Sequence, residues 1–219
     1  MVIGKELRPK RKPKKVVFIL HFLIIFILWT FLVLYPNPYR FAVSIYRISN
    51  PAINPEAISH LLEEVPDDPQ EIERYVLTKI PYQFDWLTYG VPFYFPTVEE
   101  VLANGTGDCK SRFVVLASIF EAKGISYRQS FSLSHFWVHY DGKEENPIEL
   151  ETNALFIRND DGEMKIQLPQ EDLKEIYEVL KEGFWDFMPL HRKFLFVAGL
   201  PMSIMIAYYI RKRRLEDLY

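Results

Sequence analysis

Hydrophobic residues are concentrated in two long runs, one near each end of the chain. The first covers residues 16–35 and contains no lysine, arginine, aspartate or glutamate. As a helix, this run would be about 30 Å long, which is enough to cross the hydrocarbon core of a bilayer. The second extends from Phe194 to Ile210 and continues through Gly199 and Pro201. We therefore predict transmembrane helices at residues 16–35 and 188–210, with a buried soluble helix as the alternative for the second.

Basic residues flank both runs on the side away from the centre of the chain. Seven lysines and arginines lie within residues 1–15, and four lie within residues 211–219, directly after the second run. Because positively charged flanks stay on the cytoplasmic side, we predict two basic cytoplasmic tails and an extracytoplasmic central domain. The first run is also compatible with a cleavable signal peptide, but no small-residue cleavage site follows it, which favours a retained anchor.

The segment between the two runs contains both helical and extended patterns. Residues 36–68 are rich in proline and are predicted to form a membrane-proximal connector and helix, and residues 69–187 a separate domain. Apolar residues at helical spacing predict helices, whereas an aromatic stretch without this period predicts an extended loop that walls a cleft. The predicted helices cover Pro55–Val65, Pro69–Ile80, Thr97–Ala103 and Gln170–Phe187, and the loop covers residues 82–95.

The centre of the domain is predicted to begin with a buried helix. Gly107 and Asp108 are turn and cap residues, an apolar run follows, and Gly124 suits the position just after a helix end. Segments with extended patterns come next, separated by turn residues. They cover Ile125–Phe131, Ser134–Tyr140, Pro147–Asn153, 155–158 and 164–168. The predicted fold class is therefore α+β: a helix packed on a small antiparallel sheet, with two flanking transmembrane helices.

Acidic residues dominate the segment between the two runs. From Pro36 to Lys193 there are 26 aspartates and glutamates against 15 lysines and arginines. An acidic domain with basic tails argues against nucleic-acid binding and favours contact of the tails with anionic lipid. The sequence has no glycine-rich phosphate loop and no cysteine and histidine spacing typical of a metal site. We expect the lipid bilayer as a partner, and no cofactor or metal.

Cys109 is the only cysteine in the chain, so it cannot form a disulfide within one molecule. At the start of the predicted helix, unpaired backbone N–H groups and the helix dipole favour a thiolate; a buried, unreactive thiol is the alternative. His135 and His139 point to the same face of the next predicted strand, because side chains alternate with a period of two. Glu149 and Glu151 share a face of the following strand for the same reason.

Four short segments together resemble the core of the transglutaminase-like superfamily. They are residues 96–102, Gly107-Asp108-Cys109, Ala122-Lys123-Gly124-Ile125 and His135-Phe136-Trp137-Val138, and the similarity covers about residues 70–155. It implies a papain-like core in which Cys109 is the nucleophile and His135 the base. Leu150-Glu151-Thr152-Asn153 resembles the strand that carries the third member of the triad, with Glu151 in place of the family's aspartate.

The resemblance also implies groups that stabilise an oxyanion. They are the backbone N–H of Cys109 and the indole of Trp86, since an upstream tryptophan has this role in some transglutaminases. His139, Glu149 and Asn153 are alternative triad members, Asn153 because an amide orients the histidine in papain-like enzymes.

The implied activity proceeds through a thioester on a peptide or amide bond. Hydrolysis, as by a protease or amidase, and glutamine-to-lysine acyl transfer both use this intermediate, and the sequence does not choose between them. The substrate or partner is expected to be a protein or peptide outside the cytoplasm. The alternative is a catalytically inactive scaffold or interaction module at the membrane surface, which the glutamate at the aspartate position favours.

Overall fold

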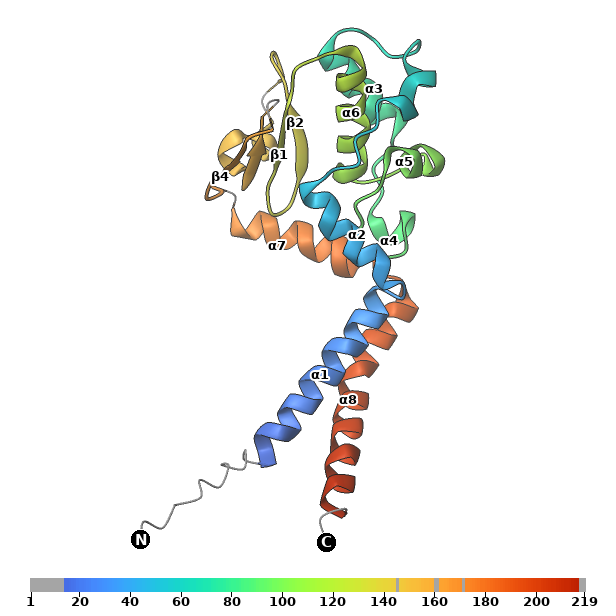
Figure 1. Ribbon diagram of the computed structural model, residues 1–219, viewed down its shortest axis with the longest axis vertical. Coiled ribbons are helices and arrows are strands. Elements are labelled where there is room, and N and C mark those ends of the chain that lie inside the picture. Colours follow the sequence, from blue (N-terminus) through green and yellow to red (C-terminus); the bar gives the residue numbers. More distant parts are fainter. Residues whose placement is uncertain (1–13, 145, 160–161, 171, 217–219) are drawn as a thin grey trace, which may run out of the picture. The chain divides into compact units, whose positions relative to one another are not determined.

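The computed structural model describes residues 14–144, 146–159, 162–170 and 172–216 (Figure 1). Most of the two predicted tails, residues 1–13 and 217–219, and the hairpin turn at residues 160–161 lie outside the described residues. The chain divides into two units. One consists of residues 14–36 and 190–216, and the other of residues 37–189.

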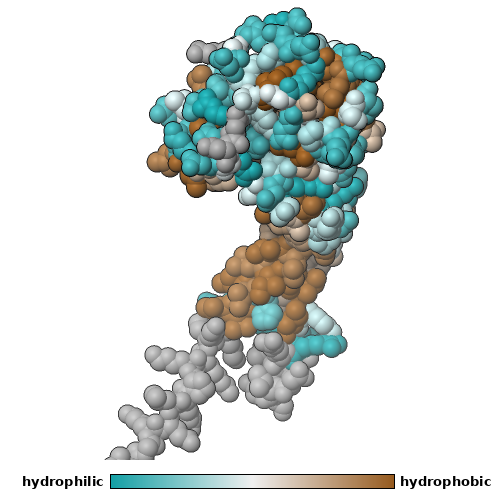
Figure 2. Space-filling model, turned by 45° about the horizontal axis from the view of Figure 1, so that its top comes forward, coloured by the Kyte–Doolittle hydropathy of each residue, from teal (hydrophilic) through white to brown (hydrophobic). Residues whose placement is uncertain are grey.

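The first unit is a pair of long helices, α1 (Lys14–Leu34) and α8 (Leu190–Glu216). Both are long and apolar enough to cross a membrane by length and composition, and Figure 2 shows apolar side chains over their surface. Two side chains join the helices by donating to backbone carbonyl groups. The indole nitrogen of Trp29 lies 2.8 Å from the carbonyl oxygen of Leu195, and Arg192 donates to Val33 at 2.7 Å.

The second unit is built around α6 (Cys109–Lys123), whose side chains from position 113 to position 120 are all buried. The Asp108 side chain accepts from backbone N–H groups of the first turn, and Gly124 ends the helix in the left-handed conformation, with φ 67°. This end favours glycine, because other residues adopt positive φ only at a cost. Three helical elements pack on α6: η1 (Glu56–Leu61), α3 (Pro69–Lys79) and α5 (Val98–Asn104).

In the described part of this unit, four strands form one antiparallel sheet in the order β2-β1-β3-β4. The second strand packs directly on α6. The mixed α+β class and the antiparallel sheet are therefore confirmed. The strands are β1 (Arg128–Phe131), β2 (Phe136–His139), β3 (Phe156–Arg158) and β4 (Met164–Ile166).

The predicted strand at residues 147–153 was wrong. The segment forms two short 3-10 turns, η2 (Pro147–Glu149) and η3 (Glu151–Asn153). The reason is local, because the Asn146 side chain accepts a hydrogen bond from the backbone N–H of Ile148 and a proline follows it directly. An asparagine cap before a proline starts a helical turn rather than a strand. Glu149 and Glu151 therefore do not share the face of a strand.

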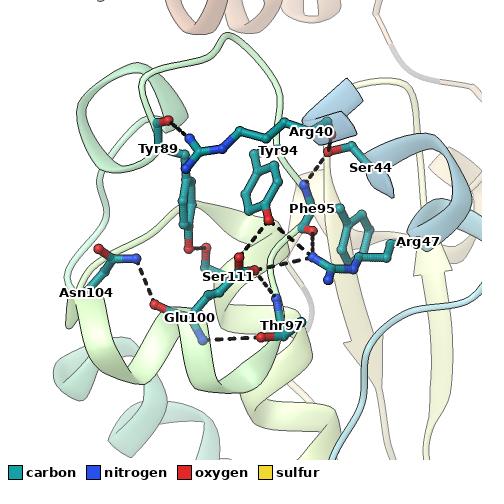
Figure 3. Close-up of polar contacts among 10 residues, drawn as sticks. All are labelled: Arg40, Ser44, Arg47, Tyr89, Tyr94, Phe95, Thr97, Glu100, Asn104 and Ser111. Carbon is teal, nitrogen blue, oxygen red and sulfur yellow. Dashed lines mark hydrogen bonds and ion pairs between the residues drawn. The ribbon is translucent and has the colours of Figure 1, made fainter. Parts of the chain in front are cut away.

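The predicted connector contains a helix, α2 (Pro38–Ser49). Its prolines lie before and after the helix or at its first position, where a missing N–H is tolerated. Figure 3 shows Arg40 and Arg47 extending from α2 to the carbonyl groups of Tyr89 and Phe95. These contacts attach α2 to the segment that precedes α5. The aromatic loop contains the short helix α4 (Asp85–Thr88), and the last predicted helix divides into α7 (Leu173–Lys181) and a π-helical turn, η4 (Glu182–Asp186).

Candidate active site

Cys109 is the first residue of α6 and is partly exposed. The Asp108 carboxylate accepts from the N–H groups of Lys110 and Ser111, at 3.0 and 3.4 Å. The backbone N–H of Cys109 is not used by this cap, so it can donate to a negative charge that develops beside the sulfur. Gly107 allows the chain to approach the helix closely, since a Cβ atom at this position would overlap the Ser111 side chain.

The His135 ring lies beside the sulfur of Cys109 and forms a hydrogen bond with it. His135 immediately precedes β2, and its backbone N–H donates to the hydroxyl of Ser132 at 3.1 Å. Its ring is stacked on the indole of Trp137, with centroids 5.9 Å apart. The turn and the indole thus fix both the position and the plane of the imidazole.

The third member of this group is Glu149. Its Oε1 atom lies 2.8 Å from Nε2 of His135. Because Nε2 is engaged by the carboxylate, Nδ1 is the ring nitrogen left for the sulfur of Cys109. The carboxylate and the imidazole are both largely buried, with 14% and 26% of their side-chain surfaces exposed. The structure therefore places a thiol, an imidazole and a carboxylate in one hydrogen-bonded line.

Burial by itself lowers the pKa of His135, but hydrogen bonds to the Cys109 sulfur and to Glu149 outweigh it and raise the pKa to about 10. Burial also acts against the Glu149 carboxylate. Hydrogen bonds and charge from His135 and Lys143 nevertheless bring the Glu149 pKa below its ordinary value. The raised pKa of His135 favours its imidazolium form beside the sulfur, an arrangement that suits thiol chemistry.

Lys143 forms an ion pair with the second carboxylate oxygen of Glu149. Its ammonium lies 2.9 Å from Oε2 of Glu149 and 2.5 Å from Oε1 of Glu73, and its side chain is only 5% exposed. The hydroxyl of Tyr140 donates to the other oxygen of Glu73 at 2.6 Å. Both oxygens of Glu149 are therefore held, which fixes a carboxylate that is one methylene longer than aspartate.

Three of the sequence-predicted residues lie apart from His135. Glu151 pairs with Arg128 at 3.2 Å and is 45% exposed, and the amide of Asn153 donates to the carbonyl of Pro147 at 2.9 Å. His139 is at the end of β2, away from the Cys109 cavity. Burial and the nearby Arg128 guanidinium lower its pKa. The carboxylate at the histidine is Glu149, which was the alternative, and not Glu151.

Trp86 does not face the sulfur. Its indole is buried, and its N–H donates to the carbonyl of Phe184 at 2.8 Å. It therefore has no proton free for an oxyanion, and its observed role is to hold the π-helical turn η4 against α4. The predicted tryptophan donor is thus wrong, and of the two predicted donors the backbone N–H of Cys109 is the one at the sulfur.

A cavity of about 370 Å³ lies beside Cys109. Its walls combine apolar side chains with the charged group around His135, so it has room for part of a substrate next to the sulfur. The lining residues are Glu73, Val76, Leu77, Tyr82, Cys109, Arg112, Phe113, Leu116, His135, Phe136, Trp137, Val138, Lys143, Glu144, Asn146, Ile148 and Glu149.

A second buried cluster lies next to Cys109. The Lys110 ammonium is within 3.0 Å of Asp85, contacts Asp108, and is over the ring of Phe93. Burial and the neighbouring Asp108 raise the pKa of Asp85 to about 7. Among the described residues, Oδ1 of Asp85 has no hydrogen-bond partner. The cluster anchors the first turn of α6 to the α4 helix through Asp85.

Sequence reasoning missed Glu73, Lys143, Asp85 and Lys110. A lysine next to the nucleophile in an otherwise apolar helix was a usable signal, because a buried lysine requires acidic partners. No such signal existed for Lys143, whose partner Glu73 is 70 residues away in the sequence.

We found no match to this chain among protein-family models, curated proteins or solved structures. Within the described residues, no three histidine, cysteine, aspartate or glutamate side chains are grouped as they would be around a metal ion.

Proposed function

We propose that this protein is a membrane-anchored, transglutaminase-like cysteine enzyme that acts through a thioester on peptide or amide bonds. The observation that carries the proposal is the line Cys109, His135 and Glu149 at the start of a buried helix, beside a cavity. The same order of a helix-start thiol, a strand histidine and an orienting polar group is the basis of papain-like catalysis.

The chemistry follows from the protonation states. The Cys109 thiolate attacks the carbonyl carbon, and the backbone N–H of Cys109 donates to the oxygen that becomes negative. His135 then gives its proton to the leaving amine as the C–N bond breaks, which leaves a thioester on the sulfur. Water or a second amine attacks this thioester, its proton passes to His135, and the thiolate is released. Glu149 keeps the ring in the orientation that both steps require.

The position in the cell is part of the proposal. The helices α1 and α8 are the candidate membrane spans, and the basic residues outside them favour cytoplasmic tails. The catalytic unit would then act on a protein or peptide on the other side of the membrane. The choice between water and an amine as acceptor stays open, and hydrolysis is the simpler expectation for a small anchored domain.

The test is the pH dependence of Cys109 alkylation by iodoacetamide, measured on detergent-solubilised wild-type protein and on His135→Ala. Rapid labelling at pH 6 that is lost in the variant is the expected result, because an imidazolium keeps the thiolate present well below the ordinary thiol pKa of about 8.5. His139→Ala is the matched control and should label like the wild type.

An ordinary thiol profile, unaffected by His135→Ala, would instead favour the inactive scaffold. The partial exposure of Cys109 and its contact with His135 are the observations that favour the enzyme over this alternative. A walled-in thiol far from both histidines would have favoured the scaffold.

A further inference from the structure

The charged groups that line the Cys109 cavity are nearly all paired with one another or with a neighbour. Glu73 and Glu149 share Lys143, as described above. Glu144 pairs with Arg74 at 3.5 Å. The exception is Arg112, which has no ion pair with an acidic side chain among the described residues and whose guanidinium borders the cavity.

A backbone carbonyl group and an aromatic ring hold Arg112 in place. Its Nε–H donates to the carbonyl of Ile80 at 3.0 Å, and its guanidinium lies 5.2 Å from the centroid of the Tyr82 ring. Tyr82 is itself fixed, because its strand segment pairs with Gly107 just before the nucleophile. These contacts leave the terminal N–H groups of the guanidinium available to a ligand, and no carboxylate among the described residues forms an ion pair with it.

The placement of Arg112 relative to the sulfur is set by the helix. It follows Cys109 by three residues, so the two side chains are neighbours on one face of α6, with Cβ atoms about 5–6 Å apart. Both line the same cavity. A group bound by the guanidinium would therefore lie a few bonds from a carbonyl carbon attacked by the thiolate.

From this arrangement we infer that Arg112 is a carboxylate-binding residue, and that the substrate carries a free carboxylate within a few bonds of the carbonyl that Cys109 attacks. A guanidinium binds a carboxylate with two parallel hydrogen bonds, and partial burial strengthens this contact. The inference rests on the proposed function, since it names the substrate class of the same site. The terminal carboxylate of a peptide and an acidic side chain next to the attacked bond both have this chemistry.

Two alkylating reagents of nearly equal size test the inference on the full-length protein in detergent. Iodoacetate carries a carboxylate and iodoacetamide does not, and in both cases the thiolate displaces iodide and forms a sulfur–carbon bond. The measured quantity is the iodoacetate to iodoacetamide rate ratio at pH 7, divided by the same ratio for glutathione. We expect this normalised ratio to be about 10 or more in the wild type, and to fall to about 1 in Arg112→Gln.

Arg128→Gln is the matched control, because it removes an arginine that pairs with Glu151 and does not line the cavity. It should keep the wild-type ratio, and Arg112→Lys should keep part of it. A normalised ratio near 1 in the wild type, or one that Arg112→Gln leaves unchanged, overturns the inference. If Arg112→Gln fails to fold, the wild-type protein still tests the inference. Acetate should slow its labelling by iodoacetamide, and acetamide should not. Equal effects of acetate and acetamide contradict the inference.

Protection against iodoacetamide then identifies the source of the carboxylate. The probes are N-acetyl-Ala-Ala with a free carboxylate, its C-terminal amide, and N-acetyl-Ala-Asp amide. Protection by the first alone indicates a peptide terminus, and protection by the third indicates an acidic side chain. Protection by the neutral amide that equals that of the two anionic probes contradicts the inference. Because rate ratios can be measured at any pH at which Cys109 labels, this result is separate from the pH profile that tests the proposed function.

Discussion

The Nε2 atom of His135 lies 2.8 Å from Oε1 of Glu149, and this contact determines which acidic residue orients the ring. Glu151, two residues later, is turned toward Arg128. Glu149 ends the turn η2 and Glu151 begins the turn η3, with Leu150 in an extended conformation between them, so the two side chains do not follow the alternation of a strand. In a strand, the two carboxylates would have pointed the same way.

Replacing Glu149 with glutamine should reduce the reactivity of the thiol at low pH. Without the carboxylate the imidazolium is less favoured, so the proton returns to the sulfur and the thiolate fraction falls. We expect iodoacetamide labelling at pH 6 to be about 10-fold slower than in the wild type, and labelling at pH 9 to be nearly unchanged. Glu151→Gln is the control, and an equal loss in both variants would contradict the assignment of Glu149.

Replacing Lys143 with methionine should destabilise the second unit. It leaves the carboxylates of Glu73 and Glu149 largely buried without their shared cation. Removing one partner of a buried ion pair costs about 2–4 kcal/mol at such sites, which corresponds to a fall of about 5–15 °C in the thermal midpoint. Tryptophan fluorescence on heating measures the midpoint. Lys165→Met, on an exposed position of β4, should differ from the wild type by less than about 2 °C.

Asp85 gives the stability of the second unit a defined pH dependence. Burial and Asp108 raise the folded pKa of this acid to about 7, so the folded state binds a proton that the unfolded state binds only near pH 4. Its contribution to stability is therefore complete below about pH 4 and is lost as pH rises through about 7. Asp85→Asn mimics the protonated form. The thermal midpoint of this variant relative to the wild type should be higher at pH 8 than at pH 5.

The outcome that would contradict this prediction is a midpoint difference that is the same at both pH values. Asp67→Asn is a suitable control, because this aspartate contacts Lys123 at the protein surface and is fully exposed. Its midpoint difference should vary little between pH 5 and pH 8.

The topology can be tested on the native thiol, because Cys109 is the only cysteine in the chain. A membrane-impermeant maleimide added to intact expressing cells should label Cys109 if the second unit lies outside the cytoplasm. A variant that combines Cys109→Ala with Arg213→Cys should be labelled only after permeabilisation. Labelling of Cys109 that requires permeabilisation would place the unit in the cytoplasm.

Local sequence signals predicted the centre of the fold well. Asp108 and Gly124 marked the two ends of α6, since caps depend on a few neighbouring residues. They failed where proline was taken as a sign of irregular structure, at α2, and where alternation was taken as a sign of a strand, at η2. In both segments an asparagine cap followed by proline was the decisive signal, and it starts helical turns.

The residues that surround Cys109 and His135 in the candidate site were less predictable than these two residues. Cys109 and His135 belong to short motifs, but the choice of Glu149 depends on the break between the turns η2 and η3 at Leu150. The ion pair of Lys143 and Glu73 joins segments 70 residues apart in the sequence. The indole N–H of Trp86 donates to a carbonyl group 98 residues away. Such pairings are set by tertiary packing, which no pattern of neighbouring residues encodes.

The neutralised lysine next to the nucleophile also has a consequence for ionic strength. Lys110 follows Cys109 directly, but its charge is compensated by Asp85 and Asp108. Lys110 therefore adds little positive field at the sulfur, and the cation that lines the cavity with Cys109 and has no acidic partner among the described residues is Arg112. Dissolved salt screens such a charge within about 8 Å, so the capture of an anion by Arg112 should weaken as salt is added.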